Sequence, residues 1–279
     1  MAPLTFRVAP GKKVDLNDYD PRHSADLAKA KTEAAFPKLA QQIDELQELL
    51  FAAGTHSLLI ILQGMDTSGK DGSIRSVFGE VDPLGAHTVS FKVPTAEELG
   101  HDFLWRIHRQ TPQRGQLAIF NRSHYEDVLV VRVHSLVSEA VWKKRYAMIN
   151  NFEQLLAESD TIILKFFLHI SKQEQEQRLL EREQEVTKAW KLAVGDWQER
   201  EHWDAYQEAY AEALERCSTD HAPWYIVPAD RKWYRNTAMA TTIIEALQPY
   251  KKIWLDKLAT IGAEAKAELE AFRAEKGTD

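Results

Sequence analysis

Nine residues from Gly64 to Gly72 combine glycines, hydroxyl groups and a lysine in an order that suits phosphate binding. They follow the apolar run Leu58–Leu62 and precede a helical pattern. Gly64 and Gly69 permit backbone conformations that aim consecutive N–H groups inward, while a helix N-terminus and the Lys70 ammonium add positive charge. The alternative is a simple strand-to-helix turn with Lys70 in solvent. The residues predicted to contact phosphate are Gly64, Met65, Asp66, Thr67, Ser68, Gly69, Lys70, Asp71 and Gly72.

The loop departs from the common pattern G-x-x-x-x-G-K-S/T at its last position, where Asp71 replaces the hydroxyl that ordinarily binds Mg²⁺. A magnesium ion must therefore be held by another group. Asp66 lies inside the loop and carries the carboxylate oxygens that a hard cation prefers. We expect Asp66 to bind Mg²⁺, because a carboxylate among phosphates would otherwise repel them. The alternative is a loop residue that accepts backbone hydrogen bonds.

A second group of polar residues follows Gln116–Phe120, the third run that predicts a strand. Neighbouring parallel strands end at one edge of a sheet, so these residues should face the same phosphates. The Arg122 guanidinium suits phosphoryl oxygens, and Glu126 and Asp127 suit a metal or the acceptor. Alternatively, Ser123 caps a helix, and Glu126 and Asp127 are favourable charges in its first turn.

Further cationic side chains are candidates for contacts with a phosphate chain. Two of them lie at or after the carboxyl ends of predicted strands, at the same edge of the sheet. The others lie in an acidic helical stretch, where a mobile lid over about residues 178–200 would exclude water, since hydrolysis competes with transfer. The alternative for the arginines is pairing with glutamates of their own helix. The residues assigned in this way are Lys92, Arg178, Arg182, Lys188 and Arg235.

The chain as a whole predicts strands that alternate with helices. Five short apolar or β-branched runs predict strands, at 58–62, 87–93, 116–120, 161–168 and 223–227. Helical spacing fills the intervals and ends in two closing helices over 231–247 and 251–276. This alternation predicts an α/β protein with three α/β/α layers around a five-stranded parallel sheet. We expect an extended N-terminal arm over 1–23, one domain over 24–250 and a C-terminal helical segment over 251–279.

Composition restricts the class of protein. The 279 residues are 44% hydrophobic and 28% charged, with a net charge of −7 and one cysteine, Cys217. These values are typical of a globular protein with a sizeable core and no internal disulfide. A negative molecule repels polyanions as a whole, so local donors must hold a phosphate, and nucleic acid is not an expected partner. Without a signal-peptide pattern or a run of about 18 apolar residues, we expect a cytoplasmic protein with no membrane segment.

Four ordered blocks, GMDTSGKDG, FKVPTAEE, FNRSHYEDVLVVRVH and PADRKWYRN, make residues 10–250 resemble the polyphosphate kinase 2 family. The resemblance implies a P-loop kinase fold with a helical lid and Mg²⁺ as the cofactor. It implies inorganic polyphosphate and a nucleotide as substrates, with reversible transfer of a phosphoryl group between them. It also implies assembly into a homodimer or homotetramer.

Individual positions of the family motifs can be placed on this sequence. The family's metal-proximal aspartate is replaced here by Asn121, and Glu126 stands where many relatives carry a neutral residue. This combination resembles the subgroup that phosphorylates AMP as well as ADP. The replacement leaves open which carboxylate shares the metal with Asp66, and we assign Asp127. The catalytic residues that the resemblance and this choice imply are Asp66, Lys70, Arg122 and Asp127.

Two other functions are compatible with the same loop. A nucleoside monophosphate kinase would use ATP as the donor, and a non-catalytic module would bind phosphate or nucleotide without turnover. The several candidate charges beyond Lys70 argue against the second alternative.

Overall fold

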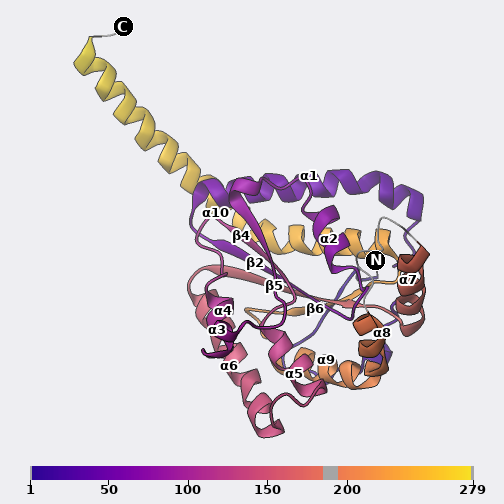
Figure 1. Cartoon of the computed structure of the whole chain (residues 1–279). Coiled ribbons are helices and arrows are strands. Elements are labelled where there is room, and N and C mark those ends of the chain that lie inside the picture. Colours follow the sequence, from indigo (N-terminus) through magenta and orange to yellow (C-terminus); the bar gives the residue numbers. More distant parts are fainter. Residues whose placement is uncertain (1, 185–193, 278–279) are drawn as a thin grey trace.

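The computed structural model describes residues 2–184 and 194–277, which form an α/β protein around one mixed sheet (Figure 1). The strand order is β1-β6-β5-β2-β4-β3. Five of these strands run parallel and occupy the predicted segments. The strands are β1 (Phe6–Arg7), β2 (Ser57–Gln63), β3 (Ala86–Ser90), β4 (Leu117–Asn121), β5 (Thr161–His169) and β6 (Trp224–Pro228).

Strand β1 corrects the prediction of a five-stranded parallel sheet. Phe6 pairs with Ile226 and Arg7 with Tyr225 in antiparallel register, which makes the sheet six-stranded and mixed. Without this partner, β6 would expose a row of unpaired N–H and C=O groups, and the extended arm satisfies them. A two-residue strand is too short for its periodicity to be detected in the sequence.

Helices occupy the connections between strands. The two predicted closing helices form one continuous helix, α10, which runs through Pro249 because buried Leu247 and Trp254 anchor the chain on both sides of the proline. The helices are α1 (Lys29–Ala53), α2 (Lys70–Val77), α3 (Ala96–Leu99), α4 (Trp105–His108), α5 (Val130–Val133), α6 (Glu139–Glu158), α7 (Lys172–Gln184), α8 (Val194–Glu201), α9 (Trp203–Cys217) and α10 (Lys232–Lys276). Three 3₁₀ turns are η1 (Leu16–Asp18), η2 (Pro83–Gly85) and η3 (His124–Asp127).

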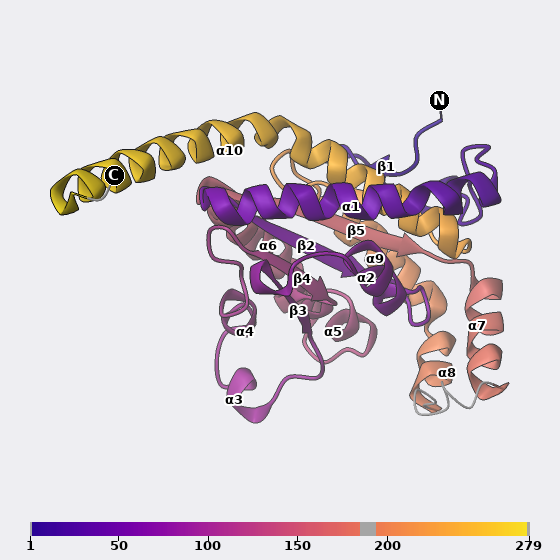
Figure 2. The ribbon, with the colours of Figure 1, turned by 90° about the horizontal axis from the view of Figure 1, so that it is seen from above.

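Helical layers cover both faces of the sheet (Figures 1 and 2). Successive side chains of the fully buried strand β2 point to opposite faces. Leu58, Ile60 and Leu62 therefore join the core beneath α1 and α10. Leu59 and Ile61 join the core that α6 and α9 complete on the other face. The expected three-layer arrangement is thus present.

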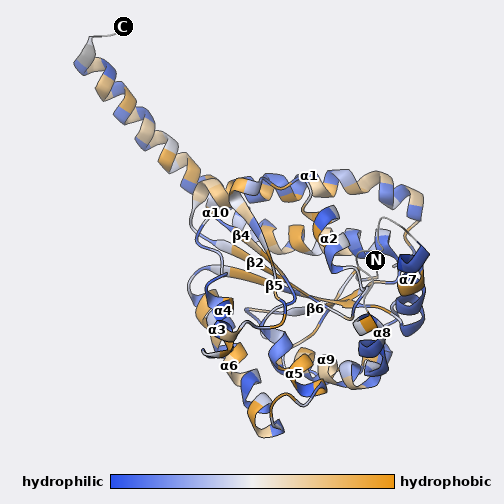
Figure 3. Cartoon of the chain, in the orientation of Figure 1, coloured by the Kyte–Doolittle hydropathy of each residue, from blue (hydrophilic) through white to orange (hydrophobic). Residues whose placement is uncertain are grey.

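Two parts of the chain extend beyond these layers. Helices α7 and α8 stand past the carboxyl ends of the strands (Figure 2) and are among the most hydrophilic segments (Figure 3). The last turns of α10 project away from the body on the other side (Figure 1). No helix within the described ranges is long and apolar enough to cross a membrane.

Candidate active site

The glycine loop, residues 64–69, joins the carboxyl end of β2 to the first turn of α2. Gly64 and Gly69 have φ angles of 152° and 103°, a backbone region that L side chains rarely adopt. A Cβ on Gly69 would lie 1.8 Å from Arg235 Nη1. The Thr67 and Ser68 hydroxyls are buried in the loop without a hydrogen-bond partner. The loop is therefore tightly wound and leaves polar groups for a ligand.

Lys70 begins α2, and its side chain folds back across the glycine loop. Nζ donates to Gly64 O at 2.7 Å and to Met65 O at 3.2 Å. Burial and the neighbouring Arg122 lower the pKa of Lys70 to about 8, although three nearby carboxylates oppose this shift. Because an ammonium has three N–H groups, one is left for a ligand. A bound anion would favour the charged form of this lysine.

Arg178 supports the glycine loop and has no N–H group to spare for a phosphate chain. Its donors reach five acceptors at 2.8–3.2 Å, and its side chain is buried. The acceptors are Glu174 Oε1 and the carbonyl oxygens of Thr67, Ser68, Ala229 and Asp230. The predicted contact between Arg178 and polyphosphate is corrected accordingly, because this side chain ties the loop to the end of β6.

Arg235 reaches the same loop from the first turns of α10. Its Nη1 donates to Ser68 O at 3.1 Å, and Nε and Nη2 donate to Asn236 Oδ1. Burial and the nearby Arg178 lower the pKa of Arg235 to about 9. These acceptors are neutral, so the charge of Arg235 adds to the positive field beneath the loop. Arg235 thus contacts the loop backbone, and its contact with phosphate stays a prediction, since Nη1 and Nη2 each keep a further N–H group.

The arginine turn, residues 122–127, follows β4 and faces the glycine loop. Arg122 has φ 63°, the left-handed region, which is strained for a residue with a Cβ. Its Nη2 lies 2.5 Å from Asp66 Oδ1, and its Nη1 lies 3.1 Å from Glu126 Oε2. Burial opposes the charge on Arg122, but these two carboxylates raise its pKa above the ordinary value. The two strand ends therefore meet, as their parallel order predicts.

Two other predicted residues contact neighbours in different ways. Asn121 Nδ2 donates to Asp71 Oδ1 at 2.8 Å, which links β4 to the start of α2. Asp127 accepts from Arg145 Nη1 at its Oδ1, 2.8 Å, and at its carbonyl oxygen, 3.0 Å. Burial raises the pKa of Asp127, although Arg145 opposes this. Glu126, and not Asp127, is thus the carboxylate that shares a guanidinium with Asp66.

The glycine loop and the arginine turn open onto one cavity of about 650 Å³. Lys92 lines it, and side chains such as Phe91, Val130 and Leu136 give it an apolar wall. A concave site with convergent polar groups and an apolar wall is typical of a site for a small molecule. Its lining also includes Tyr206 and Tyr210, together with residues that the sequence interpretation missed, namely Arg106, Arg145 and Glu199.

Helix α8 closes one side of this cavity. Arg182 Nη1 donates to Asp196 Oδ2 at 2.8 Å, so α7 and α8 are joined by an ion pair. Glu199 lines the cavity and accepts from Tyr206 OH at 2.6 Å. Arg182 is therefore paired with a carboxylate. The partner is Asp196 of α8, and not a glutamate of its own helix, which was the alternative considered from the sequence. Lys188, the other predicted lid residue, falls outside the described residues.

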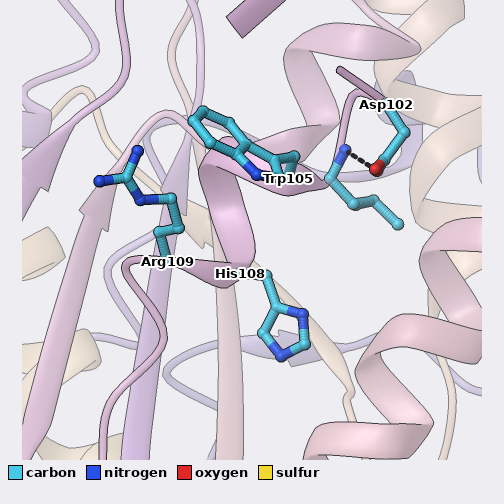
Figure 4. Close-up of a pocket in the computed structure, with 5 residues that line it drawn as sticks. Asp102, Trp105, His108 and Arg109 are labelled. Atoms are coloured by element: carbon cyan, nitrogen blue, oxygen red, sulfur yellow. Dashed lines mark hydrogen bonds between the residues drawn. The ribbon is translucent and has the colours of Figure 1, made fainter.

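A second hollow of about 400 Å³ lies along α4 (Figure 4). Arg109 stacks over the Trp105 ring with 4.7 Å between its guanidinium carbon and the ring centroid. The carboxylate at this hollow, Asp102, accepts from the Leu104 N–H at 3.0 Å and so caps the local turn. None of its lining residues belongs to the glycine loop or the arginine turn. The chemistry expected from the sequence therefore belongs to the larger cavity.

The larger cavity offers carboxylates suited to a magnesium ion. Asp66, Glu126 and Asp127 line it, and the Asp66 side chain is 22% exposed. The described residues contain no group of three His, Cys, Asp or Glu side chains that could enclose a metal. Mg²⁺ ordinarily keeps several waters and binds one or two carboxylates together with substrate phosphates. The residues present fit that mode of binding.

A glycine loop beside a buried lysine, at the carboxyl ends of parallel strands, defines a phosphate-binding α/β protein. The family model described as polyphosphate kinase 2 matches residues 26–253, and the chain belongs to this family.

Relatives of known name support this assignment. The chain is 50% identical over 245 residues to an AMP/ADP-polyphosphate phosphotransferase of Meiothermus ruber, which covers 87% of this chain and 92% of the relative. It is 43% identical over 267 residues to an ADP-polyphosphate phosphotransferase of Rhodopseudomonas palustris, and this match covers 88% of this chain and 90% of the relative. The crystal structure of polyphosphate kinase 2 from Arthrobacter aurescens TC1 is similar to this structure, with a TM-score of 0.83 and 44% sequence identity. The match covers 86% of this chain and 87% of that chain.

Proposed function

We propose that this protein transfers a phosphoryl group reversibly between inorganic polyphosphate and a nucleotide, converting ADP to ATP and AMP to ADP. The observation that carries the proposal is that the glycine loop, whose Gly64 carbonyl is bound by Lys70, and Arg122 meet at one cavity in a chain of this family. The cavity has charged groups for phosphates and an apolar wall for a nucleoside.

The architecture that goes with this function is a P-loop kinase fold with a helical lid. The strand, glycine loop and helix β2-loop-α2 support the first part of this proposal. Helices α7 and α8, which lie beyond the strand ends and are joined through Arg182 and Asp196, support the second. In this proposal, movement of the two helices excludes water from the transferred group.

The transfer requires that the nucleotide and the polyphosphate chain are placed next to each other and that their negative charges are neutralised. A terminal phosphate oxygen of the nucleotide attacks the terminal phosphorus of polyphosphate, and the bond from that phosphorus to the remaining chain breaks. One phosphoanhydride bond replaces another, so no covalent enzyme intermediate is needed. Lys70 and the loop N–H groups hold the transferred phosphoryl group, and Arg122 holds the polyphosphate chain.

Magnesium is the cofactor that we propose for this reaction, held by Asp66 together with one carboxylate of the arginine turn. When bound, the ion would neutralise charge that develops on the phosphoryl oxygens. Arg122 links Asp66 to Glu126 at the same place, whereas Asp127 is held by Arg145. We therefore propose Glu126 as the second magnesium ligand in place of Asp127, the residue assigned from the sequence.

The decisive test supplies the purified protein with ADP or AMP, polyphosphate and Mg²⁺ but no ATP. We expect ATP from ADP, and ADP from AMP. A nucleoside monophosphate kinase would give no product until ATP was added, and a binding module would show ligand-induced thermal stabilisation without turnover. Failure with AMP but success with ADP would remove the acceptance of AMP, for which Asn121 and Glu126 provide the support, and leave the rest of the proposal intact.

We further propose that the protein is a cytoplasmic homodimer or homotetramer. The projecting part of α10 supports assembly, because Ile261 and Leu269 are 39% and 46% exposed on it. Light scattering after size exclusion should give a multiple of the 32.0 kDa chain mass. Ile261→Glu with Leu269→Glu should shift the protein toward the monomer, and an unchanged mass would remove α10 from the interface.

A further inference from the structure

A closed cluster of polar side chains lies in the core behind the arginine turn. Lys165 of β5 and Glu153 of α6 are 0% exposed, and Nζ lies 2.5 Å from Oε2. Lys165 also donates to Tyr125 OH at 2.8 Å and to Cys217 O at 2.6 Å, so its three N–H groups are used. The other oxygen of Glu153 accepts from Tyr125 OH at 2.8 Å and lies 3.1 Å from His124 Nε2.

The charges in this cluster are mutually compensated. Burial alone would raise the pKa of Glu153, but Lys165 and His124 hold it below the ordinary value. A carboxylate accepts hydrogen bonds only, so the His124 contact requires the proton on Nε2. Apolar residues of similar volume can replace a buried ion pair with little loss of stability. The pair therefore calls for an explanation other than stability.

The backbone of the arginine turn provides that explanation. Arg122 holds a left-handed conformation, and a strained residue persists only where its surroundings fix it. His124 and Tyr125, the two residues that Glu153 binds, lie between Arg122 and Glu126 in the chain. The cluster thus holds the middle of the turn from the core, while its two ends face the cavity.

A second contact from the same helix fixes the end of the turn. Arg145 of α6 binds Asp127 at both its carboxylate and its carbonyl oxygen. Arg145 and Glu153 are eight residues apart in α6, so one rigid helix contacts the turn at two points.

We propose that Glu153 and Lys165 are positioning residues, which hold the arginine turn so that Arg122 faces the polyphosphate chain. This inference rests on the proposed function, because the effect it predicts is on phosphoryl transfer. Neither residue lines the cavity. Glu153 acts through His124 and Tyr125, and Lys165 acts through Tyr125. A merely structural pair would affect the folded fraction of the protein and leave the turnover of folded molecules unchanged.

The test compares two double variants that leave no unpaired charge in the core. Glu153→Leu with Lys165→Met removes the acceptor for His124 and Tyr125, whereas Glu153→Gln with Lys165→Met keeps an acceptor oxygen. We expect the first variant to lose about ten- to hundredfold in kcat with a small change in KM, as for other groups that orient a site residue. The second should recover most of that loss. Hydrogen exchange of the turn amides should be faster only in the first variant.

The matched control is Leu164→Ala, which removes a buried side chain of β5 on the opposite face of the sheet. It should lower Tm while kcat, measured well below Tm, stays at the wild-type value. A folded first variant with wild-type kcat and exchange overturns the inference, as does an equal fall of kcat in Leu164→Ala. If the first variant does not fold, Tyr125→Phe is tested by the same two measurements. It removes the hydroxyl that donates to Glu153 and accepts from Lys165, so a fall of about fivefold or more in kcat is expected from two lost hydrogen bonds.

Wild-type activity is measured alongside the variants. If the wild type transfers no phosphoryl group from polyphosphate to ADP, the proposed function is refuted. The role of Glu153 and Lys165 in holding the arginine turn would still be tested, because hydrogen exchange of the turn amides does not depend on activity.

Discussion

The guanidinium of Arg122 lies 2.5 Å from the carboxylate of Asp66, although the two residues are 56 positions apart in the chain. This ion pair joins the glycine loop after β2 to the arginine turn after β4. We expect Arg122→Gln to lower kcat by about a hundred- to a thousandfold, the usual effect of losing one preorganised donor. ATP formation from ADP and polyphosphate measures it.

Arg114→Gln is the matched control for this change. Arg114 pairs with Asp160 at 2.8 Å, but both side chains are about half exposed and lie at the opposite edge of the sheet. Its loss should leave kcat at the wild-type value, because exposed pairs contribute little and this one is far from the cavity. Equal losses in the two variants would contradict the role of Arg122.

Two glycines near Arg235 should respond in opposite ways to a methyl group. A Cβ on Gly69 would lie 1.8 Å from Arg235 Nη1, and the φ of 103° is unfavourable for alanine. A Cβ on Gly72 would make an ordinary contact of 3.5 Å with Nη2, inside helix α2. Gly69→Ala should cost about 1–3 kcal/mol and most of the activity, whereas Gly72→Ala should stabilise by about 0.5–1 kcal/mol. Denaturant unfolding gives both values, and a stable, active Gly69→Ala protein would show that the loop tolerates a side chain there.

The sequence predicts the local chemistry of the loop better than its surroundings. Five strands and the meeting of the glycine loop with the arginine turn follow from patterns within single segments, because parallel strands must end at one edge. The edge strand Phe6–Arg7 depends on a free edge more than two hundred residues away, which no local pattern encodes.

The roles of the arginines show the same limit. Arg178 and Arg182 are equivalent by helical spacing, yet Arg178 is buried against loop carbonyls and Arg182 pairs with Asp196 of α8. Arg106 and Arg145 reach the cavity from helices with no motif to mark them. Tertiary contacts decide such roles, and spacing along one helix carries no information about them.

Arg178 and Arg182 should therefore differ when each is replaced by methionine. Arg178→Met leaves the carbonyl oxygens of Thr67, Ala229 and Asp230 without their side-chain donor and should cost about 3 kcal/mol or more in stability. Arg182→Met breaks a partly exposed pair and should cost about 1 kcal/mol or less. If α7 and α8 act as a lid, Arg182→Met should still change KM for polyphosphate. Thermal unfolding and initial rates separate the two effects, and equal losses of stability would contradict the supporting role of Arg178.

The lowered pKa of Lys70 predicts how phosphate binding depends on pH. In the free protein this pKa is about 8, below its ordinary value, so the ammonium is lost as the pH rises through that point. Binding of an anion favours the protonated form and takes up a proton in that range. The affinity for tripolyphosphate should fall about tenfold between about pH 7 and about pH 9. Titration calorimetry should show this fall in the wild type and a flat profile in Lys70→Met, and equal slopes would exclude Lys70 as the group responsible.

Removal of single carboxylates should identify the groups that hold magnesium. Asp66→Asn should raise the half-saturating Mg²⁺ concentration by at least about tenfold, because a neutral amide oxygen is a weaker ligand for a hard cation. Glu126→Gln should have the next largest effect, since Glu126 shares Arg122 with Asp66. Asp127→Asn should change the Mg²⁺ requirement least, because Asp127 pairs with Arg145 and does not share Arg122 with Asp66. Initial rates against Mg²⁺ concentration give this order, and a larger shift for Asp127→Asn than for Glu126→Gln would restore Asp127 as the second ligand.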